Sequence, residues 1–290
     1  MIIIIGAILF STKAILVKLA YRHDIDHLSL LAIRMSIAFP IYTVILILRK
    51  KKKDEVRLRR KDIFHIALFG ILGYYLASYF DFKGLQFISA GLERVILFLY
   101  PTIVLFLSAV FLKKKIFKVQ ILAILISYVG VSMAYLGDIS WTDNPDIHRG
   151  VIYVFIAAIT YASYLVGSGW LLPRVGTIRF TGIAMLCASG YVVIHYLIAG
   201  GTLESLLQHD HEVYIYGAAM AVIATVIPSF MVSEGIRRIG ANNAAIIGGI
   251  GPVSTIIMGY YILGESFTLL QLAGTGLVIM GILIISLKGK

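Results

Sequence analysis

Six charged residues interrupt long apolar stretches of the sequence, and their types could bind or move a charged ligand. They are Lys13, Lys18, Arg34, Asp81, Glu93 and Arg94. A charge within an apolar layer costs about 2.5 to 3.5 kcal/mol on insertion scales, so such residues usually face a cavity or an oppositely charged partner. Four cations and two anions make the set net positive, which favours a ligand that bears a carboxylate or phosphate group.

Lys13 is the deepest of these charges, at roughly 12 Å from the end of its segment with a helical rise of 1.5 Å per residue. It has no acidic residue one turn away. We predict that Lys13 contacts an anionic ligand group and that Arg94 is a second contact. Arg34 and Lys18 could instead brace helix ends or extend their charges towards the membrane surface.

Glu93 and Arg94 are neighbours, so on a helix their side chains point about 100° apart. One is expected to face the cavity and the other a partner helix. A structural and a functional role for Glu93 both stay open. The four nearby cations argue against proton coupling through Glu93, and Asp81, near a helix end, is expected to pair with one of them.

Two prolines recur inside apolar segments, and each removes a backbone hydrogen bond and permits a bend. Pro101 and Pro252 are therefore candidate hinges or gates, with a static kink as the alternative. Gly248 and Gly251, just before the second proline, leave room for a ligand or for close helix packing. Asn243, near the start of the same segment, could bind a ligand or cap the helix.

The composition indicates a membrane protein with many spans. Of 290 residues, 59% are hydrophobic and 14% are charged, and the mean hydropathy is +0.92. Soluble domains contain about a quarter charged residues. The net charge of +11 sits in short loops between apolar segments, which favours lipid headgroups over nucleic acid as its partner.

We expect ten helical spans from the length of the apolar segments, since about 20 residues cross a bilayer. They are 2–21, 28–48, 63–82, 88–112, 119–137, 151–172, 180–200, 213–233, 241–263 and 267–287. With both termini in the cytoplasm, 19 Lys and Arg residues fall in cytoplasmic segments and 3 in external loops. That bias predicts the orientation, and all six intramembrane charges then lie in the external half of the layer.

A gapless match of residues 84–112 with residues 235–263 indicates an internal repeat. It pairs Gly84 with Gly235 and Pro101 with Pro252. An odd number of spans in each half turns the second copy upside down, so the repeat is inverted. The expected units are a first repeat at 1–137, an external linker at 138–150 and a second repeat at 151–290.

The sequence resembles EamA-type members of the drug/metabolite transporter superfamily over essentially its whole length. The matching pieces are FSTKAILVKLAY, LLAIRM, YYLASYFDFKGLQFISAGLERVILFLYP and IGANNAAIIGGIGPVSTIIMGYYILGE. A lysine of the family pattern falls on Lys18, whereas Lys13 and the Glu93–Arg94 pair are additions to it. The resemblance implies a ten-helix inverted-repeat fold whose cavity is lined by spans 1, 3, 4, 6, 8 and 9.

Within that implied cavity, Tyr79, Tyr100 and Tyr164 are further candidate ligand contacts. The resemblance implies export or exchange of a small metabolite by alternating access across the cytoplasmic (inner) membrane of a bacterium. The positive charge set favours an amino acid or organic anion. A multidrug exporter of cations and a membrane-embedded lipid-handling protein are the alternatives, and a monomer and a dimer are both open.

Several other functions are not expected. The sequence has no phosphate-binding glycine loop with a lysine, no HExxH pattern and no nucleophile elbow, so we expect neither an enzyme nor ATP-driven transport. The single cysteine, Cys187, allows no disulfide within the chain. Two histidine-containing loops, at 23–27 and 209–211, are read as ordinary polar loops, and no metal or cofactor is expected.

Overall fold

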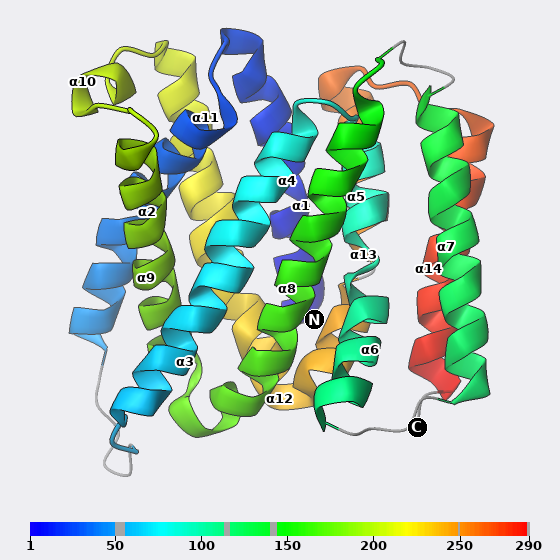
Figure 1. Ribbon diagram of the computed structural model, residues 1–290, viewed down its shortest axis with the longest axis horizontal. Helices are drawn as coiled ribbons and strands as arrows, with labels where there is room; N and C mark the ends of the chain where they lie inside the picture. Colours follow the sequence, from blue (N-terminus) through cyan, green and yellow to red (C-terminus); the bar gives the residue numbers. More distant parts are fainter. Residues whose placement is uncertain (50–55, 113–116, 140–143, 249, 289–290) are drawn as a thin grey trace.

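The computed structural model describes residues 1–49, 56–112, 117–139, 144–248 and 250–288. Within these ranges every regular element is helical and no strand is present. Most helices run along a common direction in one bundle, with the connections gathered at its two ends (Figure 1). The predicted all-α class is confirmed.

The first half of the chain forms seven α-helices, one 3₁₀ turn and one π-helical turn. They are α1 (Ile2–Ala20), the 3₁₀ turn η1 (Tyr21–His23), α2 (His27–Leu48), α3 (Arg60–Gly70), the π turn η2 (Ile71–Leu76), α4 (Ala77–Leu85), α5 (Ala90–Leu97), α6 (Tyr100–Leu112) and α7 (Lys118–Ile139). The elements α3, η2 and α4 form one continuous apolar helix.

The second half follows a similar order. Its elements are α8 (Ile147–Val175), α9 (Thr177–Ile198), α10 (Leu203–Leu206), α11 (His211–Ala221), the π turn η3 (Val222–Val226), α12 (Ile227–Ile247), α13 (Ile250–Met258), the π turn η4 (Gly259–Leu263) and α14 (Leu269–Lys288).

Eight helical segments in the described part of the chain are long and apolar enough to cross a membrane. Two shorter apolar helices, Gly251–Leu263 and Leu269–Gly281, come after them. The prediction of a polytopic membrane protein is confirmed at this level, and the number of ten spans stays a prediction. One expected loop is mostly helical. Helix α12 continues through 234–239 and is then broken at Gly240, whose non-helical φ of 81° suits glycine. The break falls directly before residue 241, where the next expected span begins.

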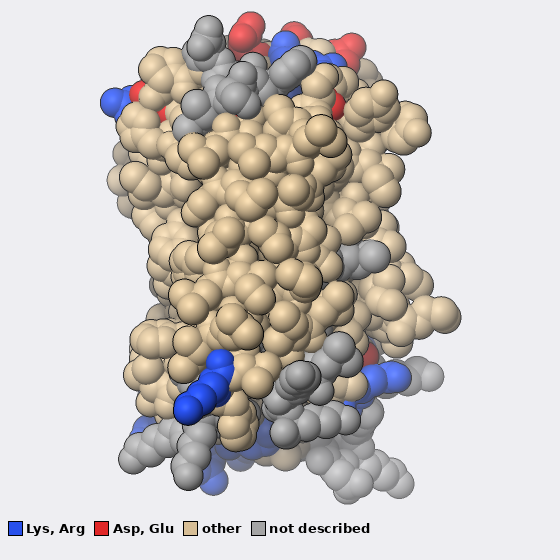
Figure 2. Space-filling model, turned by 90° about the vertical axis from the view of Figure 1, so that its right-hand side faces the viewer, with Lys and Arg blue, Asp and Glu red and all other residues tan. Residues whose placement is uncertain are grey.

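The charges on the surface separate to the two ends of the bundle, and an apolar belt lies between them (Figure 2). We call one end the acidic end, after Asp24, Asp26, Glu204, Asp210 and Glu212. The opposite end is the basic end, after Arg59, Arg60, Lys61, Arg237 and Arg238. An apolar surface belt between two charged ends is typical of a protein that spans a lipid bilayer.

Helix α5 ends four residues before Pro101 for a backbone reason. Proline has no N–H to donate to the carbonyl of Leu97, and its ring crowds that carbonyl. Helix α5 stops at Leu97, the Leu99 N–H turns back to the Ile96 carbonyl at 3.0 Å, and α6 starts at Tyr100. The predicted segment at 88–112 is therefore two helices.

Irregular points recur at one spacing in the two halves. The π turns η2 and η3 begin at Ile71 and Val222, and the prolines after each break are Pro101 and Pro252. The two π turns and the two prolines are each separated by 151 residues, which is the spacing of the sequence repeat. Turns of π-helix loosen the regular hydrogen-bond ladder and often occur at functional sites.

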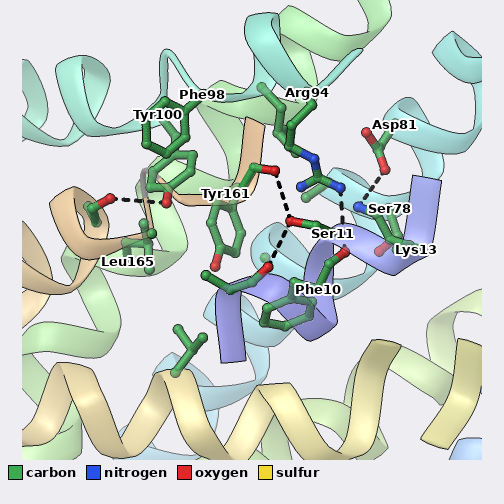
Figure 3. Close-up of a pocket in the computed structure, with 18 of the residues that line it drawn as sticks. Phe10, Ser11, Lys13, Ser78, Asp81, Arg94, Phe98, Tyr100, Tyr161 and Leu165 are labelled. Carbon is green, nitrogen blue, oxygen red and sulfur yellow. Dashed lines mark hydrogen bonds and ion pairs between the residues drawn. The ribbon is translucent and has the colours of Figure 1, made fainter. Parts of the chain in front are cut away.

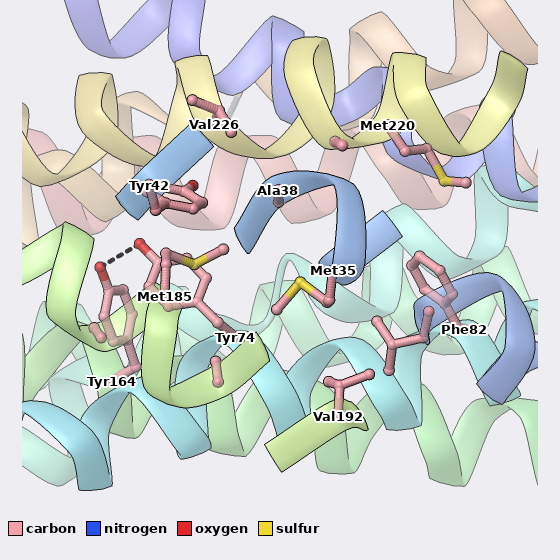
Figure 4. Packing of buried hydrophobic residues seen from close by; sticks show 14 of the residues in the cluster. Met35, Ala38, Tyr42, Tyr74, Phe82, Tyr164, Met185, Val192, Met220 and Val226 are labelled. Atoms are coloured by element: carbon pink, nitrogen blue, oxygen red, sulfur yellow. Dashed lines mark hydrogen bonds between the residues drawn. The ribbon is translucent and has the colours of Figure 1, made fainter. Parts of the chain in front are cut away.

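A large apolar cluster fixes the position of α4, because α4 and η2 pack against α2, α8 and α9 (Figure 4). Its labelled members are Met35, Ala38, Tyr42, Tyr74, Phe82, Tyr164, Met185, Val192, Met220 and Val226. Within it, the hydroxyls of Tyr74 and Tyr164 are 2.7 Å apart and share a hydrogen bond. Buried hydroxyls are expected to be paired in this way.

Helices α7 and α14 form a tight pair at one edge of the bundle (Figure 1). Gly130 and Gly274 face each other across it, and a β-carbon on either would overlap the carbonyl oxygen of the other. Small residues allow helices to pack this closely in a membrane.

We expect Gly274→Val to lower the melting temperature of the purified protein, because the added side chain pushes α7 and α14 apart. Overpacking lowers the free energy of unfolding by about 1–3 kcal/mol. Each kcal/mol lowers the melting temperature by roughly 2–4 °C. Gly276→Val is the matched control on the same helix, since a β-carbon at Gly276 meets nothing within 4 Å. Equal shifts for the two variants in a thermal denaturation assay would contradict this packing.

Candidate functional site

A cavity between the two halves of the chain is the candidate site (Figure 3). It has about 960 Å³ of empty space, including its opening. Side chains of α1, α2, η2, α4, α5 and α6 line it from the first half, and residues of α8, η3, α12 and α13 line it from the second.

Lys13 and Asp81 form an ion pair in the wall of the cavity. The Lys13 Nζ atom lies 2.5 Å from Asp81 Oδ2, and the two side chains are 12% and 1% exposed. The pair joins α1 to α4, as Figure 3 shows. Asp81 is thus paired with a cation, as expected. Lys13, which has no acidic neighbour on its own helix, finds its partner on another one.

Glu93 and Arg94 point in different directions from α5. Arg94 lines the cavity, and its Nη2 donates to the carbonyl oxygen of Phe10 at 3.4 Å. Its Nε lies 3.5 Å from Glu93 Oε2. Glu93 is fully buried, and its carboxyl group is within hydrogen-bonding reach of the Asp81 carboxyl. Arg94 is thus the member of the pair that a ligand would meet first.

Arg34 was not predicted as a site residue, but the structure places it in the cavity wall. Its guanidinium carbon lies 4.8 Å from the centre of the Phe82 ring, and its Nε has no acceptor in the described part of the chain. A buried arginine whose guanidinium lies against an aromatic ring and forms no contact ion pair among the described residues is unusual. The available signal was its position, seven residues after the start of an apolar helix at His27.

The charges in and next to the cavity wall come from five residues of the first half. Lys13, Arg34, Asp81 and Arg94 line the wall, whereas Glu93, a predicted ligand contact, is buried behind it next to Arg94. Together the five residues carry a formal charge of +1. Lys18, the sixth intramembrane charge, lies apart in a separate pocket. That pocket is shared with Ser89, Asp138 and Glu265.

The second half contributes backbone and small residues. The Tyr100 hydroxyl donates to the carbonyl oxygen of Ala245 at 3.1 Å, and a β-carbon at Gly248 would overlap that hydroxyl. The Ser11 hydroxyl lies 3.2 Å from the carbonyl oxygen of Gly251. Of the predicted residues, Tyr100, Gly248 and Gly251 thus lie in the wall with Lys13 and Arg94.

The other predicted residues lie outside the cavity wall. Tyr79 packs between the rings of His27 and His195, and Tyr164 is buried against Tyr74. Asn243 is exposed and donates to the carbonyl of Ile239 on its own helix. Pro101 and Pro252 sit just beyond the two helix breaks rather than in the wall.

At the acidic end, Glu265 ties the second half to the start of α5. Its Oε1 accepts from the Ala90 N–H at 2.9 Å and its Oε2 accepts from the Gly91 N–H at 3.2 Å. The first N–H groups of a helix have no partner within it and attract a carboxylate. Arg22 adds a second link, since its Nη2 donates to the Leu263 carbonyl at 3.0 Å.

Burial raises the pKa of Glu265 above its usual range, and it outweighs the two backbone donors and the positive charge of Lys18, which act the other way. The group therefore holds a proton more tightly in the folded chain than in the unfolded one.

One group of possible metal ligands occurs within the described residues. His23, Asp210 and Glu212 have donor atoms within 4.8 Å of one another at the acidic end. His23 Nδ1 lies 3.3 Å from Asp210 Oδ2, which is an ordinary contact between two exposed loops. We assign it neither a metal nor a cofactor.

An all-helical bundle with apolar spans around a buried, charged cavity defines a multi-pass membrane protein. The EamA-like transporter family model matches the chain twice, over residues 1–136 and 148–287. The chain therefore belongs to the EamA-like transporter family.

Curated relatives are named as transporters without a substrate. An uncharacterized transporter of Bacillus subtilis, YcbK, is 30% identical over 280 residues, which cover 94% of this chain and 88% of that protein. An uncharacterized transporter of Archaeoglobus fulgidus is 28% identical and covers 93% of each chain. YicL of Salmonella typhimurium, an uncharacterized inner membrane transporter, is 23% identical over 99% of this chain and 95% of its own.

A solved crystal structure of another protein has the same fold. It superposes with a TM-score of 0.71 over 99% of this chain and 95% of its own length, at 14% sequence identity.

We expect Glu265→Ala to destabilise the protein, because it leaves the N–H groups of Ala90 and Gly91 without their acceptor. Unmet buried donors cost about 1–3 kcal/mol each, so the melting temperature should fall by several degrees. Glu212→Ala removes an exposed carboxylate at the same end and is the control. Equal melting temperatures of the two variants would show that the contacts of Glu265 with Ala90 and Gly91 do not stabilise the fold.

The raised pKa of Glu265 predicts a pH effect with a definite sign. Between its ordinary value of 4.5 and the raised value, the folded chain keeps a proton that the unfolded chain has lost. Stability should therefore fall as the pH rises through this window. In melting curves at a series of pH values, Glu265→Gln should remove this part of the dependence, and an unchanged slope would contradict the assignment.

Proposed function

We propose that the chain is a secondary transporter that exports a small carboxylate-bearing metabolite, an amino acid or an organic anion, by alternating access. The observation that supports it is the excess of cations at the cavity: Lys13, Arg34 and Arg94 outnumber Asp81 in the wall and Glu93 behind it, which gives a formal charge of +1. A positive group in a cleft of low dielectric attracts an anion strongly. Membership of a transporter family supplies the class of activity.

Arg94 is the proposed main contact for the carboxylate. Lys13 is held at 2.5 Å by Asp81, whereas the closest carboxylate contact of Arg94 is 3.5 Å long. A guanidinium can donate two parallel hydrogen bonds to a carboxylate, which fixes its orientation. Arg34, which lines the same wall, adds long-range attraction.

The membrane arrangement belongs to the same proposal. Ten helices form two inverted repeats, at 1–137 and 151–290, joined by the linker at 138–150. The separation of 151 residues between the π turns and between the prolines supports the repeat, as do the two family matches. The excess of Lys and Arg in the expected cytoplasmic segments supports an orientation in which the basic end and both termini face the cytoplasm. The membrane is then the cytoplasmic (inner) membrane.

Alternating access requires that the cavity open in turn to each end. The helix breaks before Pro101 and Pro252 are the proposed bending points, because each proline has no backbone N–H to donate and so interrupts the helical hydrogen bonds there. The links of Glu265 to the start of α5 must then break when the acidic end opens.

Export of a cationic drug is the competing function. It would need a carboxylate that is free of nearby cations. Asp81 lies against Lys13 and Glu93 lies beside Arg94, so the contacts favour the anion.

The test is counterflow in proteoliposomes that contain the purified chain. Radiolabelled lactate, succinate and L-glutamate represent the anions, and tetraphenylphosphonium represents the cations. We expect exchange of at least one anion and none of the cation. Exchange of the cation alone would overturn the proposal in favour of drug export.

Arg94→Gln should weaken apparent affinity for the transported anion by about 10- to 100-fold, because a hydrogen bond to a charged group contributes about 1.5–3 kcal/mol. The affinity is read from the concentration dependence of counterflow. Arg60→Gln removes an exposed arginine from the first turn of α3 and is the matched control. Equal affinity in a well-folded Arg94→Gln protein would exclude Arg94 as the contact.

A further inference from the structure

Two buried carboxyl groups meet beside the cavity. Asp81 on α4 is 1% exposed, Glu93 on α5 is fully buried, and their carboxyls are within hydrogen-bonding reach of each other. Two ionised carboxylates this close repel strongly away from water. One proton between them replaces the repulsion by a hydrogen bond. The pair is therefore built as a site for a proton.

The surrounding charges make the two carboxyls unequal. Lys13 lies 2.5 Å from Asp81 and keeps it ionised. The Arg94 contact to Glu93 is 3.5 Å, longer than a good hydrogen bond, and neither Glu93 oxygen accepts a hydrogen bond from a nitrogen donor in the described part of the chain. Glu93 is thus the member that takes the proton, and Asp81 accepts its hydrogen bond.

Other titratable groups face the pair from the helices packed around it. Arg34 of α2 and Tyr21 of η1 interact electrostatically with Asp81, and Lys18 of α1 interacts with Glu93. Helix α13, which packs on α5, brings no titratable side chain among its described residues. Asp138 of α7 and Glu265 lie further along, at the first turn of α5.

Charge counting gives the direction of coupling. With both carboxyls ionised the cavity carries a formal +1, and a proton on Glu93 makes it +2. An anion beside Arg94 is held more strongly at +2, and by linkage the bound anion then holds the proton more strongly. A cation would show the opposite sign.

We propose that the Asp81–Glu93 pair binds one proton together with the anionic substrate, so that the transporter moves the two in the same direction. The inference rests on the proposed function. The proton comes from solvent and forms an O–H bond on a Glu93 carboxylate oxygen, and it returns to solvent when the anion leaves. An anion that accumulates inside the cell would carry a proton out with it.

The structure shows that fewer cations act directly on Glu93 than the sequence suggested. Four nearby cations argued against a proton on Glu93. Of these, Lys18 lies in a separate pocket, Lys13 is engaged by Asp81, and Arg34 interacts with Asp81 rather than Glu93. Two cations are left to oppose protonation of Glu93: Lys13, whose charge is engaged by Asp81, and Arg94, whose contact with Glu93 is 3.5 Å long.

The test uses Glu93→Gln, whose amide keeps the shape and can donate to Asp81 as the protonated acid does. Proteoliposomes are given lactate, succinate or L-glutamate outside, with the outside more acidic by one pH unit. We expect the wild type to accumulate the anion inside to a higher concentration than outside, up to about tenfold for one proton per anion. Glu93→Gln should keep counterflow but lose the response to the pH gradient.

A second readout does not depend on the variant folding. Addition of the transported anion to the wild-type protein in weak buffer should raise the pH of the solution, as a pH-sensitive dye reports, because protons are taken up. Glu212→Gln, at an exposed site, should behave as the wild type in both assays.

The outcomes separate the two proposals. Counterflow of an anion with no accumulation under the pH gradient and no proton uptake overturns the coupling and leaves the proposed function standing. An unchanged pH response in Glu93→Gln overturns the assignment of the site. Absence of counterflow for all three anions overturns the proposed function and the coupling with it.

Discussion

The low dielectric of the membrane interior is the constraint on which the site depends, because a charge placed there must find a partner or a wet cavity. Lys13 on α1 and Asp81 on α4 satisfy this constraint across two helices, at 2.5 Å. Asp81 then brings Glu93 of α5 into reach, and Glu93 is followed by Arg94. One buried ion pair thus draws three helices to the same side of the cavity.

Helix α5 carries both the contacts with Glu265 at the acidic end and two of the charged residues at the cavity. Its first two N–H groups are bound by Glu265 from the second half, and its next residues include Glu93 and Arg94. The helix has eight residues and ends at Leu97 because of Pro101. In the proposed transport cycle, release of Glu265 at the acidic end frees the start of the helix that carries Glu93 and Arg94.

The two halves of the chain share irregularities but not chemistry. Both have a π turn and a proline break at matching positions. The fixed charges of the cavity come from the first half, whereas the second half supplies Gly248, Gly251 and backbone carbonyls. This division suits a site in which one half holds the charged group of the ligand and the other moves past it on small side chains.

The amino-acid sequence was enough to predict the helical class, the membrane character and which charged residues interrupt the apolar segments, because apolar length and the position of a charge within it are local properties of the chain. It also identified Lys13, Arg94, Tyr100, Gly248 and Gly251, all of which the tertiary structure brings to one cavity. It could not place Tyr79, Tyr164 and Asn243 outside the wall or Arg34 inside it, because the face a side chain presents depends on neighbouring helices. Only the tertiary structure paired Lys13 with Asp81 and put Asp81 against Glu93, since these contacts join residues far apart in the chain.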